Sequence, residues 1–442
     1  MGRLFGTDGV RGLAGTELTE ELAFGLGRAA VEVLGRHGAG HPTFVVGRDP
    51  RASGEWLEDA LVEGIRTAGG DAILAGVEPT PAIAYLTVDL GASSGVVISA
   101  SHNPPEYNGI KFFASNGMKL PDAIEDEIEA AVGVPGVPAA VPGGTLSSGD
   151  GRRRYLEHLV SAASAPLDGM SVVVDCANGA ASDLAPELLA RLGATVHAIN
   201  AAPDGKNINV GCGALYPEVA AAEVLRLGAD AGISHDGDAD RALFADADGA
   251  IVDGDQVLAA CAVALKESGG LVGNIVVTTV MANIGFHHAM RIAGIDVVAS
   301  KVGDRYVLED MLRTGAVLGG EQSGHVIFRE HATTGDGLLT AVRFLSLAAA
   351  RGVSVAELAS VMRRYPQAMI NVHVRDRDAL ADAPDVWEAV RAAEAELAEE
   401  GRVLVRPSGT EPLVRVMVEA ETEDLASKHA SIIADVVRAS LG

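Results

Sequence analysis

Short apolar runs alternate with helical stretches along most of the chain. Each run has the length of a strand, ends in a polar or glycine-rich loop, and precedes a stretch rich in alanine and leucine; such runs occur at residues 43–46, 95–99, 172–175 and 275–278. Alternation of this kind is typical of α/β layers with largely parallel sheets. The pattern therefore predicts that most of the chain forms α/β domains of similar build.

Breaks in the pattern divide the chain into four predicted domains. Residues 133–151 are rich in proline and glycine and carry no periodicity, which favours a linker. Residues 253–255 form an acidic break before a helical stretch, and a third break lies at Pro366, because the residue before a proline avoids helical geometry. We expect domains at residues 1–150, 151–254, 255–366 and 367–442.

The pattern changes in the last of these domains. Strand-like segments at 369–374 and 413–419 alternate with helical stretches at 386–399 and 427–441, which predicts a small α+β domain. The predicted fold class is therefore α/β, with three similar α/β domains that have mixed, largely parallel sheets, followed by a smaller C-terminal α+β domain.

The composition excludes several classes of protein. The 442 residues include 34 Lys and Arg against 60 Asp and Glu, for a net charge of -26, which argues against a nucleic-acid partner because such binding needs a basic face. Cys176, Cys212 and Cys261 are too few and too scattered for a disulfide framework or a zinc site, which favours a reducing, cytoplasmic setting. No apolar stretch approaches the roughly 18 residues of a membrane helix, so no membrane contact is expected.

The first segment with potential chemistry follows an apolar strand that ends near Ile98. There the chain opens into the polar sequence Ser-Ala-Ser-His-Asn-Pro-Pro at residues 99–105. This places Ser101 at the carboxyl end of a strand, where open α/β sheets bind ligands. The alternative is a turn in which Ser101 and Asn103 bond only their own backbone.

The second segment contains three alternating aspartates, Asp236, Asp238 and Asp240, directly after an apolar run. An extended chain would spread their carboxylates over about 13 Å, too far to hold one ion, so a turn is required, and Gly237 permits one. Carboxylates packed in a turn need a hard cation such as Mg²⁺ or Ca²⁺. An EF-hand is excluded because its sixth and twelfth positions would be Arg241 and Ala247; a solvated acidic turn is the remaining alternative.

Two glycine-containing loops have the composition of anion-binding sites. Residues 406–412 read Arg-Pro-Ser-Gly-Thr-Glu-Pro, with Arg415 close behind, and residues 5–12 read Phe-Gly-Thr-Asp-Gly-Val-Arg-Gly, with Arg11 as the cation. Backbone N–H groups, hydroxyls and guanidinium groups together suit a phosphate. The alternative for the first loop is a hairpin with incidental arginines.

Two further loops carry polar side chains between glycines. Residues 320–325 read Gly-Glu-Gln-Ser-Gly-His, an inventory suited to gripping several sugar hydroxyls, and residues 301–305 read Lys-Val-Gly-Asp-Arg. An ordinary polar turn is the alternative for the loop at 320–325.

The five motifs at residues 5–12, 99–104, 236–241, 320–325 and 406–412, taken in this order, resemble those of the α-D-phosphohexomutase family. The resemblance extends over the whole chain, and it is closest to the branch of the family that acts on glucosamine phosphates. It implies four domains around a central cleft.

The resemblance also implies roles for individual residues. Ser101 would be a phosphoserine and, with Asp236, Asp238 and Asp240, would hold Mg²⁺. The catalytic group would be Ser101, His102, Lys111 and Arg11. The residues that would contact the substrate are Arg241, Lys301, Glu321, Ser323, His325, Arg406, Ser408, Gly409, Thr410 and Arg415. Among them, those in residues 406–415 would hold the non-reacting phosphate. The general acid or base is left open among His102, Lys111 and His325.

The implied reaction interconverts glucosamine-6-phosphate and glucosamine-1-phosphate through a 1,6-bisphosphate, and would feed UDP-N-acetylglucosamine and cell-wall synthesis. Glucosamine-1,6-bisphosphate or another hexose bisphosphate would be the activator. Gln322 and Asp304 favour the glucosamine branch, because phosphomannomutases and phosphoglucomutases tend to have Met and His there. Those two enzymes and a metal-dependent sugar phosphatase are the alternatives. An activating kinase or autophosphorylation would first load Ser101, and a homodimer is compatible with the resemblance.

Overall fold

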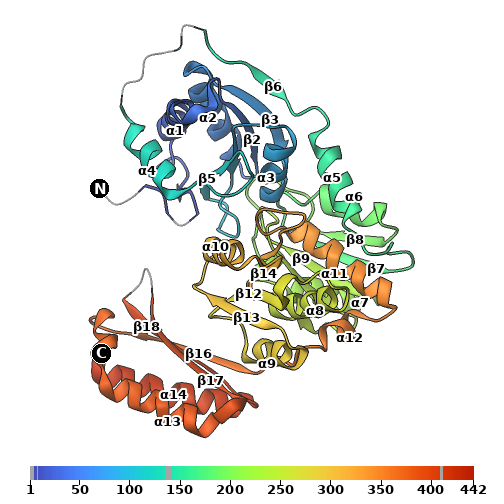
Figure 1. The fold of residues 1–442 in the computed structure, drawn as a ribbon, viewed down its shortest axis with the longest axis vertical. Coiled ribbons are helices and arrows are strands. Elements are labelled where there is room, and N and C mark those ends of the chain that lie inside the picture. The colour runs from blue at the N-terminus through green and yellow to red at the C-terminus, as the bar shows by residue number, and fades with distance from the viewer. Residues whose placement is uncertain (1–3, 7, 135–138, 140, 409–411) are drawn as a thin grey trace. The chain divides into compact units, whose positions relative to one another are not determined.

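The computed structural model describes residues 4–6, 8–134, 139, 141–408 and 412–442. Its contacts divide the chain into two compact units (Figure 1). The first unit comprises Met1–Met281 and Ile295–Ser360, and the second comprises Ala282–Gly294 and Val361–Gly442.

The first unit begins with a six-stranded mixed sheet. Its strands, in spatial order, are β1 (Val10–Leu13), β5 (Tyr107–Ala114), β4 (Ser94–Ile98), β2 (Thr43–Arg48), β3 (Asp71–Val77) and β6 (Thr145–Ser147). β5 is antiparallel to both neighbours, whereas β4, β2, β3 and β6 run parallel to one another. The parallel strands all deliver their carboxyl ends to one edge, which is where ligand-binding loops gather.

Helices cover both faces of this sheet. They are α1 (Glu20–Leu34), α2 (Gly54–Thr67) and α4 (Asp122–Ala131) on one face and α3 (Thr80–Asp89) on the other. α1 and α2 lie against each other (Figure 1) at glycines: a Cβ on Gly27 would stand 2.2 Å from the Leu61 carbonyl oxygen, and one on Gly64 would stand 2.1 Å from that of Phe24. The absence of both side chains permits this close helix packing.

A second sheet has five strands. In spatial order they are β11 (Ile251–Val252), β10 (Ala242–Asp246), β9 (Ala231–His235), β7 (Ser171–Asp175) and β8 (Thr195–Ile199). The associated helices are α5 (Gly151–Ser161), α6 (Leu184–Arg191) and α7 (Glu218–Leu227). β9 and β10 are antiparallel and are joined by the turn that carries the three aspartates.

A third sheet has four strands. They are β13 (Asp296–Ser300), β12 (Ile275–Thr279), β14 (Leu318–Gly320) and β15 (Val326–Phe328), and the helices of this region are α8 (Gly254–Glu267), α10 (Asp304–Thr314), α11 (Gly337–Arg351) and α12 (Val355–Ala359). β14 and β15 are antiparallel, and the loop between them contains Glu321 to His325.

The second unit is built on a three-stranded antiparallel sheet. Its strands are β16 (Gln367–His373), β18 (Leu413–Glu419) and β17 (Arg402–Pro407), and its helices are α9 (Ile284–Ala293), α13 (Pro384–Leu397) and α14 (Glu423–Leu441). α13 and α14 lie side by side along this sheet (Figure 1). Asn283 ties α9 to the unit, because its Nδ2 donates to the Tyr365 carbonyl oxygen at 3.0 Å.

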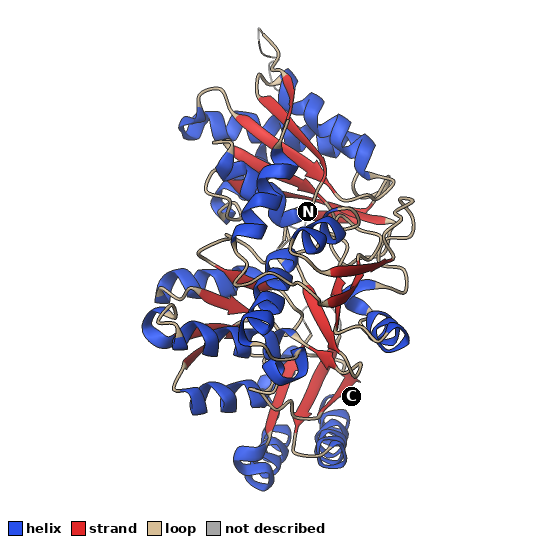
Figure 2. Ribbon diagram, turned by 90° about the vertical axis from the view of Figure 1, so that its right-hand side faces the viewer, coloured by secondary structure: helices blue, strands red, loops and turns tan. Residues whose placement is uncertain are grey.

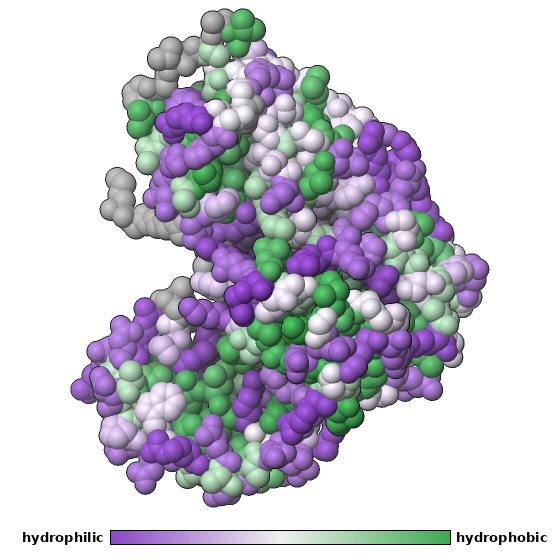
Figure 3. Space-filling model, viewed as in Figure 1, coloured by the Kyte–Doolittle hydropathy of each residue, from purple (hydrophilic) through white to green (hydrophobic). Residues whose placement is uncertain are grey.

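The predicted fold class is confirmed: three mixed sheets are followed by a small antiparallel one, with helices beside the strands in each (Figure 2). One local expectation is wrong, because the predicted linker contributes β6, which pairs with β3. On the face shown in Figure 3, hydrophobic residues are interspersed with hydrophilic ones. Within the described ranges, no helix combines the length and hydrophobicity needed to cross a bilayer.

Candidate active site

Ser101 lies in the loop that follows β4, and this loop holds it in an uncommon conformation. Its φ is 49°, in the left-handed region that costs energy for any residue except glycine. The Ser101 N–H donates to Ser99 Oγ at 2.9 Å, and its carbonyl oxygen accepts from Arg51 Nη2 at 2.8 Å and Asn209 Nδ2 at 2.9 Å. Ser101 is also buried, and these hydrogen bonds fix the position of its backbone.

Arg51 organises the whole serine loop. Its guanidinium group is fully buried, pairs with Asp49 at 2.9 Å, and donates to four loop carbonyls, those of Ser101, Asn103, Pro104 and Tyr107. An arginine is suited to this task because its five donors are held in a rigid plane. The alternative of a turn stabilised only by its own residues is therefore wrong.

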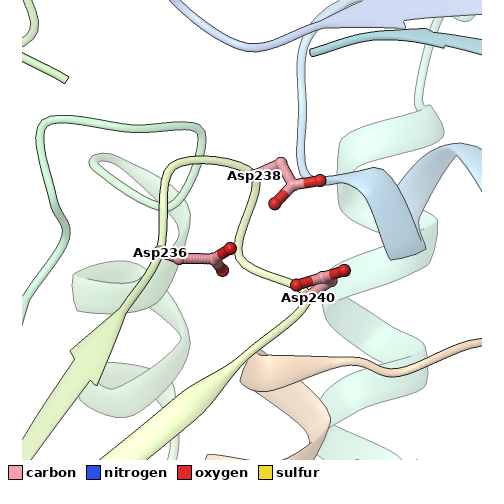
Figure 4. Close-up of side chains that lie close together, drawn as sticks. All are labelled: Asp236, Asp238 and Asp240. Carbon is pink, nitrogen blue, oxygen red and sulfur yellow. The ribbon is translucent and has the colours of Figure 1, made fainter. Parts of the chain in front are cut away.

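The three aspartates converge on one side of the turn between β9 and β10 (Figure 4). Asp236, Asp238 and Asp240 are all buried, and one carboxylate oxygen from each lies within 4.8 Å of the others. Ser101 Oγ donates to Asp236 Oδ2 at 2.7 Å. The alternative of a solvated acidic turn is wrong, because these carboxylates are withdrawn from water.

The turn that carries the three aspartates depends on its glycine for a different reason from the one predicted. The left-handed residue is Ala239, with φ 56°, and not Gly237. Gly237 is required for space instead: a Cβ there would lie 2.7 Å from the Ser101 carbonyl oxygen and 2.8 Å from Asn209 Nδ2. The glycine thus lets the aspartate turn approach the serine loop.

The three aspartates differ in their pKa values because their electrostatic surroundings differ. Burial and the neighbouring Asp240 raise the pKa of Asp236 to about 6, and burial with both neighbouring carboxylates raises that of Asp238 well above its usual value. Burial would also raise the pKa of Asp240, but His325 and Arg241 outweigh it and lower that pKa. Three carboxylates this close repel one another, and a cation among them would relieve the repulsion.

The donor set fits a hard divalent cation. All three groups offer oxygen, which Mg²⁺ prefers, and the Oδ1 atoms of Asp238 and Asp240 are buried without a hydrogen-bond partner among the described residues. Ser101 Oγ is within hydrogen-bond distance of the same cluster. The cluster is therefore a candidate metal site that includes the serine.

A chain of charges runs beside this cluster. Lys111 Nζ, on β5, lies 2.5 Å from Asp8 Oδ1 and 3.5 Å from Asp304 Oδ2, and Arg11 also pairs with Asp8. Burial opposes the charge on Lys111, but the carboxylates of Asp8 and Asp304 outweigh it and raise the pKa of Lys111. Lys111 is therefore a fixed cation and carries its proton.

The two histidines of the predicted site differ in their surroundings. His102 Nδ1 lies 3.3 Å from Ser101 Oγ, and burial together with Arg241 lowers the pKa of His102 to about 4, which leaves it neutral. His325 Nδ1 lies 3.2 Å from Asp240 Oδ2. The Gly335 N–H donates to His325 Nε2 at 3.1 Å, so Nε2 keeps a lone pair and the ring proton sits on Nδ1, facing Asp240.

The protonation state of His325 depends on Asp240 and on the Gly335 N–H, which have opposite effects. Burial disfavours the imidazolium, whereas Asp240 favours it and, without a cation, raises the pKa of His325 to about 9. The N–H of Gly335 requires the neutral ring, and a cation beside Asp240 would favour the same state. A cation at the three aspartates would therefore leave His325 neutral.

The loop between β14 and β15 is joined to the start of α10. Glu321 Oε1 accepts from the Gly303 N–H at 3.0 Å, so the two predicted polar loops are neighbours. Ser323 Oγ is buried, with no hydrogen-bond partner in the part of the chain that is described. Gln322 Nε2 lies 3.4 Å from Asp253 Oδ2, and Lys301 Nζ stands 5.6 Å from the Tyr306 ring.

The predicted phosphate loop belongs to the second unit. Arg406 on β17 and Arg415 on β18 are register partners, and burial with the like charge of Arg415 lowers the pKa of Arg406. Ser408 is buried, and its carbonyl oxygen accepts from Arg377 Nη1 at 2.6 Å. Gly409 and Thr410 lie outside the described residues. Two adjacent guanidinium groups with like charge suit an anionic ligand.

Family models match nearly the whole chain. The phosphoglucomutase/phosphomannomutase alpha/beta/alpha domains I, II and III match residues 2–133, 153–249 and 253–365, and the C-terminal domain matches residues 369–436. The chain belongs to the phosphoglucomutase/phosphomannomutase family. The family predicted from the five motifs is thereby confirmed.

Curated relatives are similar over the full length. The phosphoglucosamine mutase of Thermobifida fusca (strain YX) is 55% identical, with 100% of this chain and 99% of that protein covered. The phosphoglucosamine mutase of Rhodococcus opacus (strain B4) is 54% identical, with 99% of each covered. The predicted resemblance to the glucosamine branch is confirmed, and so is the prediction that the chain is an enzyme of the isomerase class.

Solved structures share the fold. A phosphoglucomutase/phosphomannomutase family protein from Burkholderia thailandensis has a TM-score of 0.82 at 26% identity, with 99% of this chain and 97% of that chain covered. Aspergillus fumigatus N-acetylphosphoglucosamine mutase, in complex with GlcNAc-6P and magnesium, has a TM-score of 0.72 at 18% identity, with 99% and 96% covered. At that identity, the second similarity shows the fold alone.

Several residues that shape the site were not predicted from the sequence. Asp8 lies in a recognised motif, but its position between Lys111 and Arg11 was not expected. Arg51 and Asn209 lie outside the five motifs. A signal for Arg51 did exist, since it follows the carboxyl end of a strand-like run, where ligand loops gather.

Proposed function

We propose that this protein interconverts glucosamine-6-phosphate and glucosamine-1-phosphate by way of phospho-Ser101 and a hexose 1,6-bisphosphate. The observation that carries the proposal is the 2.7 Å hydrogen bond from Ser101 Oγ to Asp236, in a buried cluster of three carboxylates. A serine at that place can carry a phosphoryl group beside a divalent cation. The high identity to phosphoglucosamine mutases supports the choice of sugar.

In the first half-reaction the bond between Ser101 Oγ and phosphorus breaks as a bond from phosphorus to O1 of the sugar forms. The O1 hydroxyl gives up its proton, and Ser101 Oγ recovers one when its alkoxide is released. The second half-reaction reverses these steps at O6 after the bisphosphate has turned around. Because serine must leave and attack in turn, its backbone has to keep one position throughout.

Asp236, Asp238 and Asp240 would hold Mg²⁺ together with the phosphoserine. Bound Mg²⁺ would neutralise charge on the transferring phosphoryl group. Lys111, Arg11 and Arg241 add fixed positive charge around the same group, and this is the role that the raised pKa of Lys111 supports.

Among the three residues considered for proton transfer, the geometry favours His102. Lys111 is held as a cation by two carboxylates, and both ring nitrogens of His325 are engaged. His102 is neutral and adjoins Ser101 Oγ. We therefore assign the sugar hydroxyl proton to His102.

The sugar and its second phosphate are assigned to the remaining predicted residues. Glu321 and Ser323 would bind sugar hydroxyls with Lys301 and His325 nearby, and Ser323 Oγ is a buried group that still needs a partner. In the second unit, Arg406 and Arg415 would bind the non-reacting phosphate together with Ser408, Gly409 and Thr410. A cytoplasmic location remains the expectation from the three scattered cysteines.

The decisive experiment compares initial rates on glucosamine-6-phosphate, glucose-6-phosphate and mannose-6-phosphate, with Mg²⁺ and a trace of hexose 1,6-bisphosphate. Free phosphate is measured in parallel. The expected result is a strong preference for the amino sugar without phosphate release. Greater activity on glucose or mannose would move the protein to another branch, and phosphate release without isomerisation would indicate a phosphatase. A Gln322→Met variant tests whether this side chain sets the preference.

A further inference from the structure

The first turn of α3 touches the aspartate turn at two points. Thr80, the first residue of α3, donates from its N–H to the Asp238 carbonyl oxygen at 3.0 Å and from its hydroxyl to Asp238 Oδ2 at 2.6 Å. Both residues are buried, with Thr80 1% exposed. A hydrogen bond this short to a carboxylate is of the strong, charge-assisted kind.

This contact determines which Asp238 oxygen is available. Because Oδ2 is engaged by Thr80, the carboxylate has one settled rotation, and Oδ1 is left buried without a hydrogen-bond partner within the described ranges. Figure 4 shows one Asp238 oxygen directed toward the segment that begins α3 and the other directed inward, toward Asp236 and Asp240. The free oxygen is the one that can bind a metal ion.

The same turn is held from a second side by another helix. Gly337, the first residue of α11, donates from its N–H to the Ala239 carbonyl oxygen at 3.0 Å. A Cβ on Gly337 would stand 2.2 Å from the Arg241 carbonyl oxygen, so the approach is as close as the backbone allows. The positive ends of two helices thus fix the backbone of the turn, which leaves the Asp238 side chain as the part that needs orienting.

We propose that Thr80 is a positioning residue for the metal site: its hydroxyl orients the Asp238 carboxylate so that Oδ1 faces the ion. The inference rests on the proposed function only in taking the three aspartates as a metal site. Partners that orient the ligands of a metal ion commonly change its affinity by 10–100-fold when they are removed. Thr80 performs this task from a different sheet domain than the ligands.

The test uses the full-length protein, freed of metal with a chelator and titrated with Mn²⁺, with binding followed by electron paramagnetic resonance. Thr80→Val keeps the shape of the side chain and removes the hydroxyl, and Thr80→Ser restores it. Thr87→Val is the matched control, because Thr87 is also buried in α3 but its hydroxyl donates to the Ile83 carbonyl oxygen of the same helix, at 2.7 Å.

The expected result is that Thr80→Val weakens Mn²⁺ binding at least about tenfold, while Thr80→Ser and Thr87→Val stay within about twofold of the unmodified protein. Normal affinity in Thr80→Val would overturn the proposal. So would equal weakening in Thr80→Ser, which would point to packing, or in Thr87→Val, which would point to a general effect on α3. If circular dichroism shows Thr80→Val to be unfolded, Thr80→Ala carries the same comparison.

The outcome is separate from that of the proposed function. Normal Mn²⁺ binding by the unmodified protein, with loss in Thr80→Val but no sugar-phosphate isomerisation, would support the role of Thr80 and refute the mutase. Isomerisation by the unmodified protein, with unchanged metal affinity in Thr80→Val, would refute only the role of Thr80.

Discussion

Ser101 follows β4 and Asn209 follows β8, two strands of different sheets in the first unit, yet the side-chain amide of Asn209 donates to the Ser101 carbonyl oxygen at 2.9 Å. The same amide lies 3.2 Å from the Asn103 carbonyl oxygen. Arg51 reaches both of these oxygens from the serine's own domain. The serine loop is therefore clamped between two domains at the two carbonyls that flank His102.

Removing one side of this clamp should slow catalysis and leave substrate binding unaffected. We expect Asn209→Ala to lower kcat by about 10–100-fold, because small displacements of a reacting atom have effects of that size, with little change in KM. Steady-state kinetics on the preferred sugar phosphate provide the measurement. Asn200→Ala is the control, because Asn200 also has positive φ (47°) but its amide bonds Asp175 at 3.1 Å, away from the serine loop. An equal kcat loss in both variants would refute a specific clamp.

Loss of the Ser101 hydroxyl should abolish turnover and leave the fold intact. Under the proposed function, Ser101→Ala removes the atom that would carry the phosphoryl group, but the loop backbone is still held by Arg51 and Asn209. We expect no detectable isomerisation and a melting temperature within a few degrees of the unmodified protein. A large drop in melting temperature would show that the hydroxyl stabilises the fold.

The sequence predicted what depends on local pattern. The apolar runs beginning at Thr43, Gly95, Val172 and Ile275 correspond to β2, β4, β7 and β12, because buried parallel strands need continuous apolar stretches. The loops at the strand ends were recognisable because their polar residues interrupt those stretches. Ser101 and Asp236 could therefore both be placed at the ends of strands, although their contact could not be predicted.

The remaining features depend on contacts between distant segments. The pairing of Lys111 with Asp304 joins two domains, and no local pattern shows that these charges meet. The contact between Arg51 and Ser101 requires β2 to lie beside β4, which is a property of the sheet order. β6 escaped prediction because a three-residue exposed strand has no apolar periodicity.

Removal of metal should lower the melting temperature of the unmodified protein more than that of Asp238→Asn, and should thereby invert the order of the two. Without a cation, the three buried carboxylates repel one another. Burial and both neighbouring carboxylates raise the pKa of Asp238 in the folded protein, whereas the unfolded chain ionises this group freely at neutral pH, and this difference opposes folding. We therefore expect Asp238→Asn to melt a few degrees higher than the unmodified protein in the presence of a chelator.

Saturating Mg²⁺ should reverse that order, because an ion that binds only the folded state stabilises it by mass action. The unmodified protein should gain several degrees and the variant little. Differential scanning calorimetry with chelator and with Mg²⁺ gives all four melting temperatures. Equal gains in both proteins would mean that the ion binds elsewhere.

Glu78, which is not one of the predicted site residues, provides a test of how folding stability depends on pH. The residue is 4% exposed, and its Oε2 has no hydrogen-bond partner among the residues described. Burial raises the pKa of Glu78 from 4.5 to about 7, although the nearby charge of Arg152 acts in the opposite direction. In the unfolded chain this carboxyl ionises near pH 4.5, whereas in the folded protein it stays protonated up to about pH 7.

The stability contributed by this raised pKa is fully present below about pH 4.5 and is lost progressively up to about pH 7. Glu78→Gln cannot ionise, so it should match the unmodified protein at pH 4.5 and be more stable at pH 8, by at most about 3 kcal/mol for a shift of this size. Melting temperatures at the two pH values, beside Glu388→Gln at an exposed position of α13, provide the measurement. A difference between Glu78→Gln and the unmodified protein that is the same at both pH values would show that Glu78 ionises normally in the folded state.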